Sequence, residues 1–246
     1  NPAVAKMVAA WESKNTKRAM QGSGLALMAM SLTACGGGSS TTAVAPVTPV
    51  VPVTPVVPTV DAAKALAFTA NLDTLTGGSG DDSFNGVFYA DGGTGTTAFP
   101  GDSVVGGSGS DTLNISVAGL STAAVSINAI QTAGVEKLLV TNFDTNATGA
   151  QETTIDTSLM VGLTSVGLNA SSAVGDTVFS NLASIVDATL ANGSGDLNLN
   201  YIASVVVGTS DIQKVAVSNV TAGTFDAPKM ETIEISSSTV KSVLTD

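Results

Sequence analysis

The sequence predicts a mainly β protein whose folded body is a β-solenoid, and three observations lead to this fold class. Apolar and polar residues alternate in runs such as DTLNISVAG and KVAVSNV, as expected for strands with one buried face. Gly, Asn, Ser and Asp separate these runs, as turns require. A phrase of turn residues followed by an apolar-x-apolar pair also returns along the chain. Its copies start near Gly134, Gly162, Asn181, Ser210 and Pro228.

Alternate copies of this phrase are 47 or 48 residues apart. A regular return of one strand type is the signature of coils stacked in a solenoid. We therefore expect the apolar pairs to face one shared core. These pairs are Leu138/Val140, Val166/Leu168, Val215/Val217 and Ile233/Ile235. A β-sandwich with irregular loops remains the alternative, because short strands separated by turns also fit that fold.

The composition limits the classes of partner. The 246 residues suffice to bury a core, yet only 12% are charged, about half the usual ~25% of soluble domains. The net charge is −11. Residues 1–35 carry four basic and one acidic residue, whereas the remainder carries five Lys and nineteen Asp or Glu. An acidic body repels phosphate backbones, so we expect no nucleic-acid partner, and it attracts cations such as calcium.

Histidine is absent, and the single cysteine is Cys35. These facts exclude Ser-His-Asp and Cys-His catalysis, His-based zinc sites and an intrachain disulfide from this segment. Arg18 is the only arginine and lies outside the expected folded body. We expect no catalytic residues and no enzyme activity.

Residues 1–35 form a basic and then apolar segment. Residues 1–23 have the apolar spacing of a short helix, and the run 24–35 is too short to span a bilayer. Its end, Leu32-Thr33-Ala34-Cys35, resembles the bacterial lipobox, which implies lipidation of Cys35 and an anchor in the cell envelope or outer membrane. The alternative is an uncleaved helix with a buried free cysteine.

Residues 36–60 read as a linker of Gly, Ser and Pro. Proline recurs at every third position, at Pro46, Pro49, Pro52, Pro55 and Pro58. Polyproline II has three residues per turn, so this spacing predicts an extended spacer.

Residues 61–120 contain two copies of G-G-x-G-x-D-x-U, at 77–84 and 106–113. This is the turn of calcium-binding β-rolls, in which glycines permit positive φ and the aspartate supplies a carboxylate. Calcium takes six to eight oxygens, so two turns must stack to complete a site. A partial copy at 92–97 has Thr97 in place of the aspartate. The candidate metal residues are Asp81, Asp82, Asp91, Asp102 and Asp111, with Gly78, Gly80, Gly107 and Gly109. The alternative is a set of Gly/Asp turns without metal.

The order of these motifs over about residues 66–240 resembles the S-layer and RTX-like surface proteins that Gram-negative bacteria export by type I secretion. The resemblance implies an extracellular structural protein that is ordered by calcium and assembles with copies of itself at the cell surface. Independently of this resemblance, the recurring phrase predicts solenoid repeats over 121–246, and because the chain stops within that pattern we expect the repeats to continue beyond the chain end. The lipobox-like start departs from that family. The alternative function is a surface adhesin or ligand-binding module on a lipoprotein stalk, which requires an exposed aromatic or polar patch.

Overall fold

We describe a computed structural model, which defines residues 60–144, 152–172, 176–238 and 241–244. These residues form β-strands and turns without an α-helix, and therefore none of them forms a helix able to cross a membrane. The expected N-terminal helix and the Pro-rich linker, as far as residue 59, lie outside the described residues.

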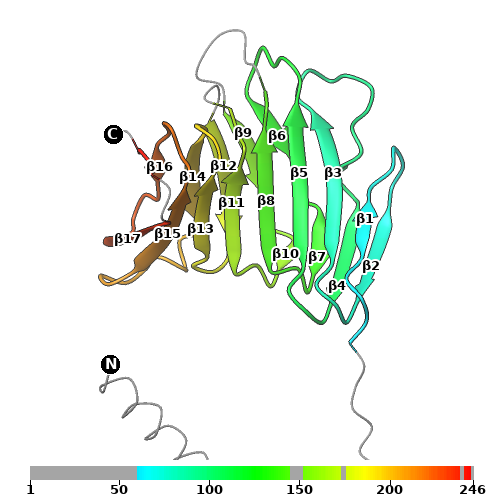
Figure 1. Cartoon of the computed structure of the whole chain (residues 1–246), viewed down its shortest axis with the longest axis horizontal. Coiled ribbons are helices and arrows are strands. Elements are labelled where there is room, and N and C mark those ends of the chain that lie inside the picture. The colour runs from blue at the N-terminus through cyan, green and yellow to red at the C-terminus, as the bar shows by residue number, and fades with distance from the viewer. Residues whose placement is uncertain (1–59, 145–151, 173–175, 239–240, 245–246) are drawn as a thin grey trace, which may run out of the picture. The chain divides into compact units, whose positions relative to one another are not determined.

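One long sheet runs through the whole described body (Figure 1). Neighbouring strands in it are all parallel, and successive strands are 18 to 29 residues apart in the sequence. Its eight strands, in spatial order, are β1 (Ala65–Ala67), β3 (Ser83–Tyr89), β5 (Thr112–Ala118), β8 (Lys137–Asn142), β11 (Ser165–Asn169), β13 (Asp187–Ala191), β15 (Ile212–Ser218) and β17 (Thr232–Ser237).

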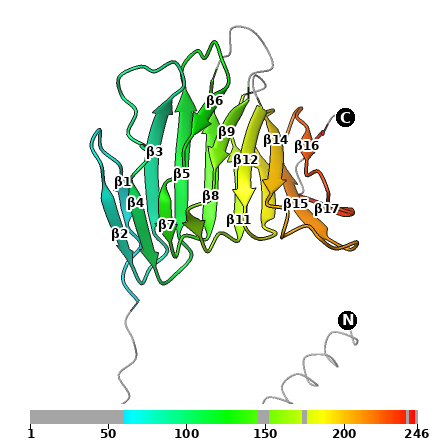
Figure 2. The same ribbon diagram turned by 180° about the vertical axis from the view of Figure 1, so that it is seen from behind.

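Two shorter parallel sheets complete the coils, and Figure 2 shows their strands from behind. The four-stranded sheet belongs to the N-terminal coils. It consists of β2 (Thr74–Gly78), β4 (Ser103–Gly107), β7 (Gln131–Ala133) and β10 (Met160–Val161). The five-stranded sheet serves the C-terminal coils and consists of β6 (Val125–Ile127), β9 (Thr153–Asp156), β12 (Asp176–Leu182), β14 (Asp196–Tyr201) and β16 (Phe225–Asp226).

The parallel pairing confirms the β-solenoid and makes the β-sandwich alternative wrong, because a sandwich of that kind is built from antiparallel strands. A parallel pair needs a crossover between its strands, and here the crossover is the rest of one coil. Each coil therefore returns to the long sheet one strand further along the axis.

The core is a stack of apolar side chains that repeat at the same place in each coil. One row of the long sheet contains Phe84, Leu113, Leu138, Val166, Ala188 and Val215, all in register and all buried. The row beside it contains Ile115, Val140, Leu168, Leu190 and Val217, which are also buried. Three of the four expected apolar pairs thus share one core.

The fourth expected pair, Ile233/Ile235, is displaced. The sequence phrase aligns Ile233 with Val215, but the structure pairs Ile235 with Val215, because Ile212 and Thr232 are in register and the turn before β17 is two residues longer. Ile233 and Ile235 are 43% and 58% exposed. Along the described chain no further strand of the long sheet follows β17 to cover them.

An asparagine ladder marks the corner between the long and five-stranded sheets. The Nδ2 of Asn192 donates to Oδ1 of Asn169 (3.0 Å), and the Nδ2 of Asn219 donates to Oδ1 of Asn192 (3.2 Å). Asn192 and Asn219 have φ of 56° and 54°, in the left-handed region that asparagine tolerates. The amides therefore turn the chain and link successive coils.

Candidate functional site

Both G-G-x-G-x-D turns lie at the corner where the chain leaves the four-stranded sheet and enters the long sheet. The turn 77–82 joins β2 to β3, and the turn 106–111 joins β4 to β5. The turns stack directly, since Gly78 and Gly107 are in register and the Ser108 N–H donates to the Gly78 carbonyl (2.9 Å). The structure therefore brings the two predicted turns together.

The glycines in this stack are needed chiefly for space. A Cβ on Gly106 would overlap the carbonyl oxygen of Gly134 in the next coil, and one on Gly107 would overlap that of Gly78. Gly107 and Gly109 also have positive φ (111° and 119°), as the sequence predicts. Gly78 and Gly80 do not have positive φ, so that expectation is wrong for the first turn. Space is what Gly80 provides, because a Cβ there would overlap the Asp61 carbonyl oxygen.

The aspartates at the end of each turn form a ladder along the solenoid axis. The Lys64 N–H donates to Oδ1 of Asp82 (2.7 Å), and the Asp82 N–H donates to Oδ1 of Asp111 (2.7 Å). The Asp111 N–H in turn donates to Oε2 of Glu136 (2.8 Å). Each carboxylate thus pairs with a backbone donor of the preceding coil. Sequence analysis missed Glu136, whose signal was an acidic residue directly before the strand run KLLV.

Asp111 is the unusual member of this ladder. It is fully buried, and its Oδ2 has no hydrogen-bond partner, whereas Oδ2 of Asp82 accepts the Gly78 N–H (2.6 Å). Burial raises the pKa of Asp111, and the nearby carboxylates of Glu136, Asp82 and Asp81 raise it further, against the opposing hydrogen bond from the Asp82 N–H. The turn stack therefore contains one buried carboxylate oxygen without a partner.

The other two candidate aspartates lie elsewhere. Asp91 is exposed and caps its own loop, with Oδ1 accepting the Gly93 N–H (2.8 Å). Asp102 is buried directly before β4, where its two oxygens accept N–H groups of Asp73 (2.9 Å) and Phe99 (2.6 Å). The partial G-G-x-G copy lies in the loop between β3 and β4, outside the stack of the two full turns.

Among the described residues, no group of three or more Asp, Glu, His or Cys side chains forms a preorganised metal site. The groups at the corner that could contribute oxygens are Asp81, whose Oδ1 accepts the Ser110 N–H (2.8 Å), Asp82 and Asp111. Cys35, the expected lipidation site, lies outside the described residues.

A second acidic ladder, which sequence analysis missed, runs across the five-stranded sheet. Asp176 and Asp196 are in direct register, and Glu152 precedes β9, the strand that pairs with β12 on its other side. Oδ1 of Asp196 accepts the Thr224 N–H (2.5 Å). Burial raises the pKa of Asp176, and the adjacent Asp196 and Glu152 carboxylates add to the shift. The missed signal was an acidic residue at the start of each of these strands, as the first residue of β12 and β14 and directly before β9.

We expect Asp176→Asn to stabilise the protein near neutral pH by on the order of 0.5 kcal/mol, because like charges directly opposite each other on neighbouring strands are destabilising. The pKa of Asp176 is raised above its ordinary value of 3.8 in the folded state. The folded state therefore holds the proton more tightly, and stability is lost as the pH rises through that raised pKa. In Asp176→Asn the free energy of unfolding should therefore fall less steeply as the pH rises. Some fall should remain, because the pKa of Asp111 is also raised in the folded state.

Denaturant unfolding of both proteins at a series of pH values measures this effect. Asp226→Asn is the matched control, because Asp226 is an exposed residue of the same sheet that pairs with Asn198 and not with a carboxylate. Equal behaviour of both variants, or a loss of stability with rising pH that is as steep in Asp176→Asn as in the unsubstituted protein, would contradict the interpretation of Asp176.

No protein-family model matches the chain, and no curated protein or solved structure is significantly similar to it.

Proposed function

We propose that the protein is a structural component of a bacterial cell surface, as a subunit of an S-layer or a similar self-assembling extracellular lattice or filament. The observation that carries this proposal is the parallel solenoid, in which eight strands of one sheet repeat in register along an axis. Stacked coils of this kind give an extended body with broad, regular outer faces. Such faces suit repeated contacts between copies of one protein.

One row of residues on the outer face of the long sheet supports the proposal further. One outward-facing row crosses seven strands in register and carries no charge: Asn85, Asn114, Leu139, Gly167, Thr189, Ala216 and Ser236. Burying an uncharged row against another copy avoids the large desolvation cost of an unpaired charge. We therefore place the contact between copies on this row.

Calcium is part of the proposal. The Gly/Asp turns stack, and the buried Oδ2 of Asp111 lacks a partner among the described residues, so the donor set fits a hard cation at this oxygen. Asp111 would supply one ligand, with Asp81, Asp82, turn carbonyls and water as the remaining oxygen sources. The ion would neutralise part of an acidic body and tie neighbouring coils to each other.

The location at the outer membrane and the lipid anchor on Cys35 belong to the same proposal. They rest on the lipobox-like run that ends at Cys35 and on the Pro-rich spacer that follows it.

A charge inserted into the uncharged row tests the proposal. We expect the purified chain in millimolar calcium to form large ordered particles in sedimentation and negative-stain electron microscopy. Ala216→Glu should prevent them, because each contact would bury a carboxylate. Thr221→Glu, at an exposed position outside the strands, is the matched control and should assemble normally. Monomers under all these conditions, or equal assembly of the two variants, would contradict the proposal.

A further inference from the structure

The connection between β3 and β4 differs from those that follow it. Residues 90–102 form a loop here, whereas the next coil has strand β6 of the five-stranded sheet between β5 and β7. The loop folds back onto β3, because the N–H groups of Thr97 and Ala98 donate to the Val87 carbonyl (2.7 and 3.1 Å). The Tyr89 N–H also donates to Oγ1 of Thr96 (3.0 Å). The loop is therefore held in one position by its own hydrogen bonds.

Three aromatic residues line an open hollow together with residues 92–96 of this loop. They are Phe88, Tyr89 and Phe99, and each is partly exposed. Phe88 also packs against the core, so Tyr89 and Phe99 are the two rings open to a ligand. The whole chain has only ten aromatic residues (seven Phe, two Tyr and one Trp), so this is a marked concentration. The loop approaches the Tyr89 ring closely, since a Cβ on Gly95 would lie 3.0 Å from it. Glycine at this position lets the backbone lie against the ring.

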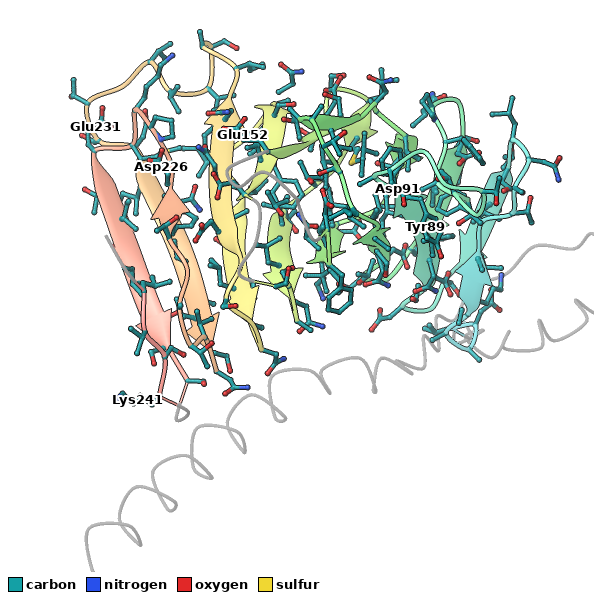
Figure 3. The ribbon with its side chains drawn as sticks, turned by 90° about the horizontal axis from the view of Figure 1, so that it is seen from above. Tyr89, Asp91, Glu152, Asp226, Glu231 and Lys241 are labelled. Atoms are coloured by element: carbon teal, nitrogen blue, oxygen red, sulfur yellow. The ribbon has the colours of Figure 1, made fainter. Side chains whose placement is uncertain are left out.

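The polar groups at the rim are hydroxyls and one carboxylate. Thr94 and Thr96 belong to the lining. Asp91 lies beside Tyr89, as both flank Gly93, and Figure 3 labels the two residues close together at this end of the solenoid. The lining contains no lysine or arginine. A carboxylate without a neighbouring cation disfavours an anionic ligand.

We propose that this hollow binds a neutral hexose unit of a glycan. Aromatic rings have a negative face that attracts the slightly positive C–H edges of a sugar ring, and a few polar groups at the rim fix its hydroxyls. The preformed loop keeps the ordering cost of binding low. This inference does not depend on self-assembly or on calcium, because the hollow lies within a single chain and away from the turn stack.

Titration calorimetry of the purified chain with cellohexaose, maltohexaose and mannohexaose tests this inference, and hexagalacturonate serves as the anionic probe. We expect saturable binding of at least one neutral hexasaccharide and none of hexagalacturonate. Tyr89→Leu keeps apolar bulk but removes the ring, and it should weaken binding at least about tenfold, as loss of an aromatic anchor does. Phe99→Leu is a second such variant, in case the first does not fold.

Phe143→Ala is the matched control, because Phe143 is an aromatic residue outside the hollow and 50% exposed. It should bind as the unsubstituted chain does. Failure to bind any of the three neutral probes would overturn the inference, as would unchanged binding by folded Tyr89→Leu and Phe99→Leu. Preferential binding of hexagalacturonate would also overturn it. None of these outcomes would affect the assembly of the chain, so the two proposals fail separately.

Discussion

Gly106→Ala is expected to destabilise the solenoid by at least about 3 kcal/mol, which is more than most single substitutions cost. A Cβ at this position would overlap the carbonyl oxygen of Gly134 and crowd Oδ2 of Asp111. The first obstacle is backbone of the neighbouring coil, which cannot move aside as the end of a flexible side chain can. Relief would require the two coils to separate at the corner that carries the aspartate ladder. Thermal and denaturant unfolding followed by circular dichroism measures the loss.

Gly208→Ala is the control for this prediction. A Cβ there would lie 3.4 Å from the Asp211 side chain, an ordinary contact, and Gly208 does not have positive φ. We expect a change within about 0.5 kcal/mol, and a small gain from the reduced freedom of the unfolded chain is consistent with this range. Equal effects of the two alanines would mean that the turns do not stack as described.

Phe179→Ala is expected to cost about 3–5 kcal/mol, as truncation of a buried aromatic residue to alanine usually does. Phe179 in β12 is fully buried and is in register with Ile155 on one side and Leu199 on the other. Its ring therefore fills one layer of the core between two coils. The cavity left by truncation cannot close without shifting both neighbours, and denaturant unfolding measures the resulting loss of stability.

Phe143→Ala is the control for this prediction. It also removes a phenylalanine ring, but Phe143 is 50% exposed, so the comparison shows how much of the loss comes from burial. It should change stability by less than about 1 kcal/mol. A small effect at Phe179, or effects of similar size at both positions, would contradict the placement of Phe179 between stacked coils.

The strands and the apolar rows could be predicted from the sequence because alternation is local. Leu138 and Val140, for example, point to the core in any half-buried strand. The choice between solenoid and sandwich depends on which strands pair, and this is decided by contacts between residues 18 to 29 positions apart. The displaced pair Ile233/Ile235 shows the limit, since a turn longer by two residues changes the register without changing the alternation.

The candidate site was predictable only in part, for the same reason. The G-G-x-G-x-D motif located Asp82 and Asp111, whose stacking needs glycine at fixed places. Glu136 carries no such motif and joins the ladder only through the register of β5 and β8. Asp91 and Asp102 are near the motifs in the sequence, but the loop 90–102 moves them to other positions in the coil.

The acidic ladder of the five-stranded sheet and the aromatic hollow were not predictable for a related reason. Asp176 and Asp196 come together only because two coils pair in register. The hollow brings Phe88 and Tyr89 to Phe99 because the loop folds back onto β3. Both features depend on the number of residues in each coil, which sets the register between neighbouring coils.

The central proposal is that calcium binds at the stacked turns and orders the protein for assembly. Its most direct test is a calcium titration of the metal-free chain, with circular dichroism and light scattering recorded on the same sample. We expect thermal stability and scattering to rise together, by about 2.7 kcal/mol of stability when calcium is a hundredfold above its dissociation constant. Asp111→Asn should lose this response, whereas Asp91→Asn, outside the stack, should retain it. No response of the unsubstituted chain at any millimolar calcium concentration, or equal loss in both variants, would contradict the proposal.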